Sequence, residues 1–283
     1  MFFDTHNHSQ FSFDGSGTTV EKSARAAAEK GFGGICFTDH CDFYVPRMKE
    51  EFEPVVSEAF DVAAQQEEID RVNRILADGA FGRSVPKKFR IFKGIELGLG
   101  EKNREQTREL LSVRRFDQII ASVHYLEDSD PYFGTYYKGK NWKEAYGRYL
   151  ETLLREMRWL EDFDIMGHFD YIARYAPYPK ESVLYRDFPG LFDEILKYLA
   201  ANGKGLEINT KSYKAYGLRR PQLDRDILIR YRELGGEVIC IGSDSHTPEQ
   251  VGDRFDYFAQ YVKTIGFRHL GHFEGRRLKM VTI

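Results

Sequence analysis

Six of the eight histidines in this chain directly follow short apolar runs typical of β-strands. They are His6, His8, His40, His124, His168 and His246. His6 and His8 stand two residues apart, so they project to the same side of a strand, because side chains alternate across it. Two imidazoles directed into one space are a natural start for a divalent metal site. A single His-x-His pair is common without a metal, but its repetition at strand after strand indicates a metal centre.

Three carboxylates occupy comparable positions. Asp14 lies in a turn after the first strand, and Glu96 and Asp244 each end a strand-like run. Each alone has an ordinary explanation as a turn, solvated or helix-capping residue. Together with the histidines they make nine candidate ligands. One zinc ion uses four ligands, or three and a water, so the set predicts two or three divalent ions of zinc, manganese or iron. Ions clustered about 3.5–4 Å apart are the usual device for in-line displacement at phosphorus.

The composition excludes several other classes of protein. With 41 Lys and Arg against 44 Asp and Glu, the formal net charge is −3, which gives no basic surface for nucleic acid or an anionic membrane. Three cysteines are too few for a disulfide framework, and no apolar run is long enough for a transmembrane helix. The candidate ligands begin at residue 6, so removal of a signal peptide would remove part of the site. We expect a soluble, cytoplasmic protein, and the sequence indicates no oligomeric state.

Strand-like and helix-like segments alternate about seven times. A first strand ends near residue 8, and others are predicted at 34–38, 90–95, 118–123, 164–166, 205–208 and 237–241. Residues 277–282 are either a short closing strand or a tail. Helices are predicted from a capping box at 18–21 to Gly31, and at 57–76, 105–113, 142–160, 191–202, 224–234 and 248–265. The composition has no internal break, so residues 1–283 are expected to form one domain.

This alternation fits either a parallel β/α barrel or a doubly wound open sheet. The positions of the polar residues distinguish them. In a barrel the carboxyl ends of the strands form a ring around one mouth, whereas an open sheet would spread the same groups along an edge. We therefore expect a barrel with a metal site at the carboxyl ends of its strands.

The ordered set of motifs resembles the PHP (polymerase and histidinol phosphatase) family over residues 4 to about 247. The motifs are His6-Asn7-His8 followed by Asp14, Phe37-Thr38-Asp39-His40, Gly94-Ile95-Glu96, Ser122-Val123-His124, Gly167-His168-Phe169-Asp170 and Gly242-Ser243-Asp244-Ser245-His246. Within the family, Leu206-Glu207-Ile208-Asn209-Thr210 and the run from Gly167 to Tyr175 resemble the histidinol-phosphatase branch. The resemblance implies a distorted (β/α)7 barrel with a trinuclear metal centre.

The resemblance also implies an assignment of ligands. His6, His8, Glu96 and Asp244 would hold one ion; Glu96 would bridge to a second ion held by His124 and His168; and Asp14, His40 and His246 would hold a third. Many relatives have a histidine where this chain has Asp14, and an oxygen donor there favours harder metals.

The implied activity is hydrolysis of L-histidinol phosphate to L-histidinol and phosphate, a step of histidine biosynthesis, by metal-activated hydroxide. Its catalytic residues would be Glu96, Asp244, His246 and Arg174. Arg174 and Lys211 are the candidate phosphate contacts, because a guanidinium offers a bidentate fork and an ammonium a point charge. Asp42 and Glu207 are the candidate contacts for the cationic amine, with Asp170 as either a third contact or a partner of a ligand histidine. The aromatic loop 132–137 is a candidate lid.

Two alternatives remain open at this stage. The same site could hydrolyse another small phosphate ester or a nucleotide phosphodiester. The chain could instead be a metal-binding module with a degenerate site, although all nine expected ligands are present. The expected partner is a small-molecule phosphate ester rather than nucleic acid or a membrane, and no residue is identified as the general acid for the leaving group.

Overall fold

Seven parallel strands form the centre of the molecule in the computed structural model, which describes residues 1–46, 57–82, 85–86 and 88–283. In spatial order they are β1 (Phe3–Asn7), β2 (Gly34–Phe37), β4 (Arg90–Gly98), β5 (Gln118–Ser122), β6 (Ile165–Met166), β7 (Gly205–Asn209) and β8 (Ile239–Gly242). A short β3 (His40–Cys41) resumes the pairing with β4 where β2 stops, and it sets His40 opposite Glu96.

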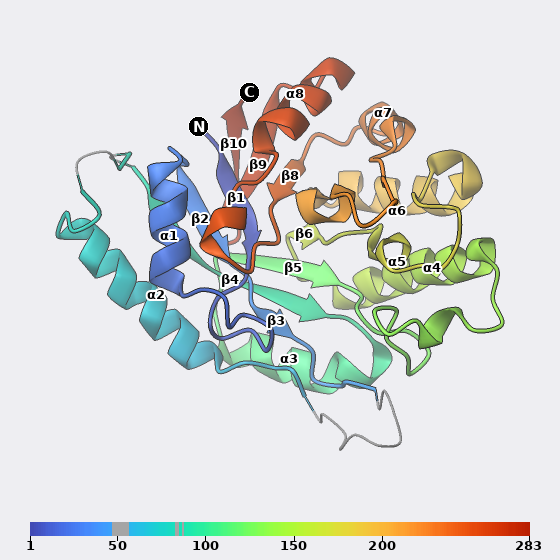
Figure 1. Ribbon diagram of the computed structural model, residues 1–283, viewed down its shortest axis with the longest axis horizontal. Coiled ribbons are helices and arrows are strands. Elements are labelled where there is room, and N and C mark those ends of the chain that lie inside the picture. Colours follow the sequence, from blue (N-terminus) through green and yellow to red (C-terminus); the bar gives the residue numbers. More distant parts are fainter. Residues whose placement is uncertain (47–56, 83–84, 87) are drawn as a thin grey trace.

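The sheet closes because its last strand returns to its first, and Figure 1 shows β1 and β8 side by side. The seam is held by a few bonds rather than a regular ladder. Asp244 N donates to His6 O at 2.8 Å, and His8 N donates to Ser245 O at 2.9 Å. The expected distorted (β/α)7 barrel is therefore confirmed.

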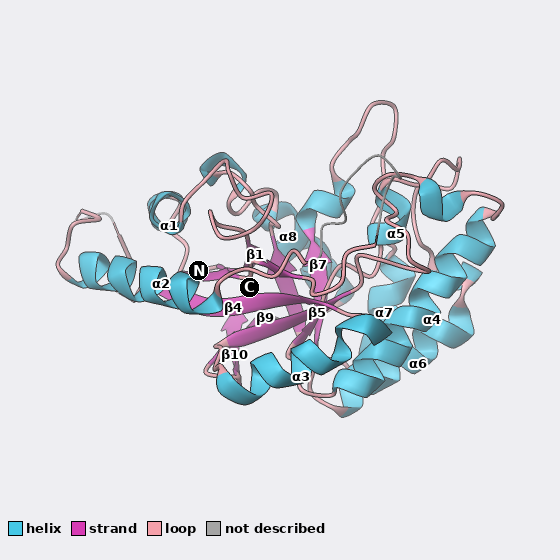
Figure 2. Cartoon of the chain, turned by 90° about the horizontal axis from the view of Figure 1, so that it is seen from below, coloured by secondary structure: helices cyan, strands magenta, loops and turns pink. Residues whose placement is uncertain are grey.

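Helices form the outer layer around the strands (Figure 2). They are α1 (Val20–Glu29), α2 (Val62–Ala77), α3 (Arg104–Val113), α4 (Trp142–Leu160), α5 (Tyr171–Arg174), α6 (Pro189–Ala201), α7 (Arg225–Glu233) and α8 (Phe255–Ile265). Short 3-10 turns are η1 (Glu101–Asn103), η2 (Thr135–Tyr137), η3 (Tyr185–Asp187), η4 (Thr210–Tyr213) and η5 (Pro248–Gln250). The hydrophobic core fills the space between the helices and the strands, where apolar faces of both are removed from water.

Two local predictions about helices were wrong. The N-cap of α1 is Thr19 rather than Thr18, since Thr19 Oγ1 accepts from Lys22 N and Thr18 Oγ1 instead bonds Ser23 Oγ. The last predicted helix, 248–265, divides into η5 and α8. Between them Gly252 and Arg254 have φ of +69° and +62°, a left-handed conformation that a helix cannot continue through.

A C-terminal hairpin closes the amino-terminal end of the barrel. It consists of β9 (His269–Glu274), which the sequence pattern did not predict, and β10 (Arg277–Thr282), which it did. Phe273 packs in one buried cluster with strand residues Ile120, Ile165 and Cys240. Arg276 Nε donates to Asp164 Oδ2 at 2.6 Å, just before β6 begins. With this end covered, the opposite mouth is left for the site.

Candidate metal centre

The nine predicted ligands lie together at the carboxyl-terminal mouth of the barrel, close to the end of β4. His6, His8 and Glu96 are fully buried, and His124, His168 and Asp244 are nearly so. His40 and His246 are half-buried, and Asp14 is exposed. A cavity of about 620 Å³ opens above them, and its lining includes Asp14, His40, His124, His168 and Asp244. The structure thus brings together residues up to 240 positions apart in the chain.

The two carboxylate oxygens of Glu96 face different histidines. Oε1 lies 2.9 Å from His168 Nε2 and 3.2 Å from His124 Nε2. Oε2 lies 2.9 Å from His40 Nδ1 and 3.3 Å from His6 Nε2. This is the arrangement of a carboxylate able to bridge two cations.

A further set of donors lies beside His8, on the side nearer to solvent. One ligand atom from each of His8, Asp14, His40 and His246 lies within 4.8 Å of the other three. Asp14 Oδ2 is 2.8 Å from His246 Nε2, and Asp244 Oδ1 is 3.3 Å from His8 Nε2. Several of these spacings approach the roughly 3.3 Å that separates two ligand atoms each about 2.0–2.1 Å from a tetrahedral ion.

Four of the buried donor atoms fit metal ligation better than hydrogen bonding. Within the described part of the chain, His6 Nε2, His8 Nε2, His40 Nδ1 and Glu96 Oε2 have no hydrogen-bond partner. Buried polar atoms are nearly always satisfied, so a cluster of unsatisfied nitrogen and oxygen donors that face one another indicates a cation site. The donor set of imidazoles and carboxylates suits zinc, manganese or iron.

The charges of the site also favour cation binding. Burial raises the pKa of Glu96, but His6, His124 and His40 oppose this and hold it well below its ordinary value. Burial, with His40 and His246 nearby, lowers the pKa of His8 well below its ordinary value, so its ring is a neutral donor. Metal ligation needs a deprotonated carboxylate and a neutral imidazole, and Glu96 and His8 meet this requirement. Burial lowers the pKa values of His6, His40 and His124, but the neighbouring carboxylates raise them overall, so a bound cation would have to displace protons from these rings.

Two predicted substrate contacts lie elsewhere. Glu207 and Asp42 are only 1% exposed and do not line the cavity. Glu207 Oε1 is 2.6 Å from His6 Nδ1, and its Oε2 accepts from His168 N at 2.7 Å. Asp42 Oδ2 is 2.9 Å from His124 Nδ1. Each carboxylate lies behind a histidine ring and orients it, so in this structure neither reaches the cavity in which we predicted a contact with the substrate amine.

The two predicted phosphate contacts do line the cavity. Arg174, at the end of α5, has its guanidinium 2.9 Å from Ser212 Oγ and 3.4 Å from Asp244 Oδ2. Lys211 Nζ, from η4, lies 3.2 Å from Asp244 Oδ1. Asp170 does not line the cavity; it accepts from Ser212 Oγ at 2.9 Å and so helps to fix the hydroxyl that Arg174 contacts.

The aromatic loop 132–137 divides into two parts. Tyr132 and Phe133 are exposed and line the cavity, as a lid would. Tyr136 and Tyr137 are buried, and their hydroxyls donate to Ala145 O and Ile172 O. The second half of the loop is therefore a structural anchor for the first.

Sequence reasoning missed two acidic residues that line the cavity, Glu58 and Asp130. Neither follows a strand, which was the signal used to find the other site residues. It also missed Asp4 and Asp39, which act on the loops that carry ligands. Asp4 accepts from both N and Oγ of Ser243, just before Asp244, and Asp39 accepts from Oγ of Ser9, just after His8.

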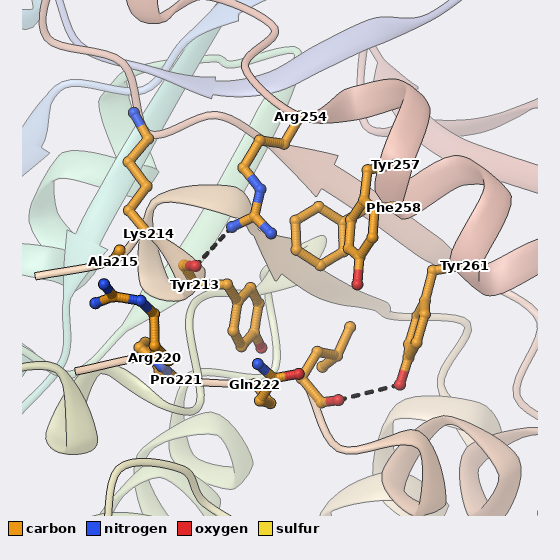
Figure 3. A pocket seen from close by; sticks show the side chains of 11 residues that line it. Tyr213, Lys214, Ala215, Arg220, Pro221, Gln222, Arg254, Tyr257, Phe258 and Tyr261 are labelled. Carbon is orange, nitrogen blue, oxygen red and sulfur yellow. Dashed lines mark hydrogen bonds between the residues drawn. The ribbon is translucent and has the colours of Figure 1, made fainter. Parts of the chain in front are cut away.

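A separate hollow of about 360 Å³ lies between the segment after η4 and α8 (Figure 3). Arg254 donates to Tyr213 O at its upper edge, and Tyr261 donates to Leu223 O. Its lining residues include Lys214 and Arg220 but no histidine or carboxylate. It therefore lacks the histidine and carboxylate ligands that a divalent metal site would need.

Among the residues described, none of the helices has both the length and the apolar character needed to cross a membrane.

The chain resembles known proteins in both sequence and fold. The PHP domain family matches residues 4–211. The histidinol-phosphatase of Lactococcus lactis is 33% identical over 276 residues, covering 97% of this chain and 95% of that protein. The crystal structure of the histidinol phosphate phosphatase of Lactococcus lactis, complexed with zinc, L-histidinol and phosphate, superposes with a TM-score of 0.81 at 30% identity over 98% of each chain. A structure from Listeria monocytogenes, at 20% identity, has a TM-score of 0.67 and covers 90% of this chain and 99% of its own, so it shares the fold.

Proposed function

The chain belongs to the PHP domain family, and from this premise we propose that it is a metal-dependent phosphatase that hydrolyses L-histidinol phosphate to L-histidinol and phosphate. The observation that carries the proposal is the cluster of nine candidate donors, Glu96 among them, in a chain that matches a histidinol-phosphatase over almost its whole length. We further propose that residues 1–283 act as one catalytic domain.

We propose that the site holds two to three divalent ions. Zinc is supported by the related structure that contains it, and the donor set also suits manganese or iron. The distribution of donors supports His6, His8, Glu96 and Asp244 around one position. It supports Glu96, His124 and His168 around a second, and Asp14, His40 and His246 around a third. The exposed oxygen of Asp14 makes the third position the one best suited to a harder metal.

When bound, such ions neutralise charge on phosphate oxygens and lower the pKa of a water molecule, so that hydroxide is available at neutral pH. The chain's own residues hold the ions and bind the phosphate. Glu96 and Asp244 bring the negative charge that lets cations sit close together, and His246 and Asp14 complete the outer donors. Arg174 and Lys211 lie at the cavity wall, where they can hold phosphate oxygens that gain charge in the transition state.

Glu207 and Asp42 act on this chemistry through the rings they contact. A carboxylate that accepts from one ring nitrogen fixes the tautomer, so the other nitrogen presents its lone pair. Glu207 does this for His6, and Asp42 does it for His124.

Phosphate release from a panel of esters tests the proposal. The zinc- or manganese-loaded protein should hydrolyse L-histidinol phosphate with a kcat/KM well above that for p-nitrophenyl phosphate or a dinucleotide. Elemental analysis should find two to three ions per chain. A preference for the dinucleotide or another monoester would favour the alternative substrates, and one ion or fewer in an active chain would contradict the multinuclear site.

A further inference from the structure

The hollow between the segment after η4 and α8 is cationic, although the chain as a whole has a formal net charge of −3 (Figure 3). The described residues that line it include Lys214, Arg220 and Arg254 but no carboxylate. Lys214 Nζ forms an ion pair at 2.9 Å with Asp253, which does not belong to the lining. No carboxylate of the described part of the chain pairs with either arginine. The hollow therefore presents two guanidinium groups whose charge these residues do not neutralise.

Both guanidinium groups keep donors available to a ligand. Arg254 Nη1 donates to Tyr213 O at 2.6 Å, and Arg220 Nη1 donates to Gly217 O at 2.8 Å. Within residues 57–82 and 88–283, no acceptor is bonded to Nε or Nη2 of either side chain. A guanidinium has five N–H donors, and its planar fork matches the oxygens of a carboxylate or a phosphate. Two such groups at one hollow favour an anionic ligand.

Aromatic rings form a second part of the lining. Tyr257 and Tyr261 stand one turn apart on α8 with their ring planes 18° apart, and Tyr257 is 55% exposed. The guanidinium of Arg254 lies 5.2 Å from the ring centroid of Tyr257 and 5.0 Å from that of Phe258. Rings beside guanidinium groups suit a ligand that has both a flat ring and an anionic group. At about 360 Å³ the hollow also has the size of a small-molecule site.

Arg254 adopts a backbone conformation that is rare for arginine. Its φ of +62° is left-handed, which is costly for a residue with a side chain. Strained residues of this kind cluster at ligand sites and switches, where the surrounding structure holds them in place. Here the residue is the N-cap of α8, and its side chain reaches across to Tyr213 O. The turn thus holds the guanidinium between α8 and η4, at the edge of the hollow.

Tyr213 connects the hollow to the phosphate side of the metal centre. It is the last residue of η4, which also carries Lys211 and Ser212. The Tyr213 side chain is hydrogen-bonded to Asp170, which accepts from Ser212 Oγ at 2.9 Å. Ser212 Oγ in turn accepts from Arg174 at 2.9 Å. A ligand in the hollow can therefore act on both candidate phosphate contacts without entering the cavity above the metal donors.

We propose that this hollow is an effector site for a small anion that carries a flat aromatic ring. Arg220 and Arg254 hold its carboxylate or phosphate, and its ring lies against Tyr257. The bound anion joins the segment after η4 to α8, which fixes Lys211 in position and favours phosphate binding at the metal centre. Among the described residues the two cavities share no lining residue, so the site is separate from the catalytic one. An aromatic carboxylate and a nucleotide share the required chemistry.

Isothermal titration calorimetry on the zinc-loaded protein tests the site with one probe from each source. The probes are indole-3-acetate and the phosphonate analogue of adenosine monophosphate, whose C–P bond resists hydrolysis. At least one should bind, and more tightly than acetate or methylphosphonate, which lack the ring. Its Kd should rise roughly ten- to a hundredfold in Arg220→Gln, the range for a lost charged hydrogen bond, and about two- to tenfold in Tyr257→Ala. The tighter probe shows whether the anion is a carboxylate or a nucleotide.

Arg225→Gln is the matched control. Arg225 is an exposed arginine at the start of α7 that donates to Thr264, and it does not line the hollow. Its variant should bind each probe as the wild type does. Wild-type affinity in Arg220→Gln would overturn the site, as would failure of both probes to bind the wild type. A dimer in sedimentation that Tyr257→Ala dissociates would also overturn it, because a second copy of the chain would then cover this face.

Kinetics test the connection to η4. A saturating probe should lower KM for L-histidinol phosphate and for p-nitrophenyl phosphate by the same factor, about fivefold or more, because both esters carry the phosphate that Arg174 and Lys211 face. Arg220→Gln should lose this response and Arg225→Gln should keep it. An unchanged KM would overturn the effector role, and so would inhibition that persists in Arg220→Gln, since the probe would then bind at the metal centre. None of these outcomes depends on which ester the wild type prefers, so the proposed function is tested separately.

Discussion

Replacing Glu207 by glutamine should weaken metal binding although Glu207 touches no proposed ion. The carboxylate faces His6 Nδ1 at 2.6 Å and accepts from His168 N at 2.7 Å, with both ligand residues buried. A glutamine has one acceptor oxygen, so it can replace only one of these bonds. Its NH₂ group must face either the backbone N–H of His168 or the ring of His6. If it donates to His6 Nδ1, the ring proton moves to Nε2, the nitrogen directed at Glu96.

The size of the effect follows from the one charged hydrogen bond that is lost, worth about 1.5–3 kcal/mol. Since 1.4 kcal/mol corresponds to a tenfold change in an equilibrium constant, metal affinity should fall roughly ten- to a hundredfold, in the range found for carboxylates behind ligand histidines. Equilibrium dialysis against graded free zinc, followed by elemental analysis, measures this directly. Turnover should return when zinc is in excess.

Two controls show whether the loss of zinc affinity is specific to Glu207. Glu237→Gln makes the same chemical change at an exposed position just before β8 and should leave zinc affinity unchanged. Thermal unfolding of the chelated proteins shows whether Glu207→Gln damages the fold rather than the site. Wild-type zinc occupancy in a folded Glu207→Gln protein would refute the idea that this carboxylate sets the His6 tautomer.

Four other outcomes are expected. Glu96→Gln removes the charge shared between two groups of histidines, so elemental analysis should find at least one ion fewer per chain and turnover should be largely lost; a fully active, fully loaded variant would exclude a bridging role. Arg174→Ala should lower kcat/KM roughly ten- to a hundredfold on both L-histidinol phosphate and p-nitrophenyl phosphate, with metal content intact. Arg174→Lys should recover only part of the lost activity, since an ammonium lacks the planar fork of a guanidinium. Unchanged kinetics in Arg174→Ala would remove Arg174 from the site. Chelation should abolish turnover and lower the Tm, because ions that bind only the folded state stabilise it, and added zinc should reverse both effects; an unchanged Tm would argue against ions in the buried donors. Phe273→Ala, in the hairpin that closes the other end of the barrel, should cost about 3–5 kcal/mol of unfolding free energy in urea while kcat/KM stays unchanged, and a selective loss of activity would contradict a purely structural role.

The architecture and the candidate metal donors could both be predicted from the sequence. Strand and helix periodicities are local, so the alternation of elements was readable, and α4 has the predicted bounds of 142–160. The donors were readable because parallel strands of a barrel all end at one mouth, which means that a ligand directly after a strand has its position fixed by topology alone. We could therefore predict that His6, Glu96 and His168 lie close together without knowing how the side chains pack.

Backbone conformation at a few positions escaped the sequence pattern. The break between η5 and α8 depends on the left-handed Arg254, a residue type that seldom signals such a turn. Strand β9 forms because it pairs with β10 at the amino-terminal end of the barrel. Its residues alone have no strong pattern that would predict a strand.

The role of each carboxylate depends on the tertiary structure. From their positions in the sequence Asp42 and Glu207 could both face the substrate, yet they contact the rings of His124 and His6, which are 82 and 201 residues away in the chain. Glu58 has no motif around it, and Asp130 stands in the Asp130-Pro131-Tyr132 loop that resembles the histidinol-phosphatases but gave it no role; both residues gain their place from the segments that line the cavity. The chemistry of a carboxylate depends on its burial and on the nearest charge. Both are set by segments distant in the chain, so they exist only once the barrel has closed.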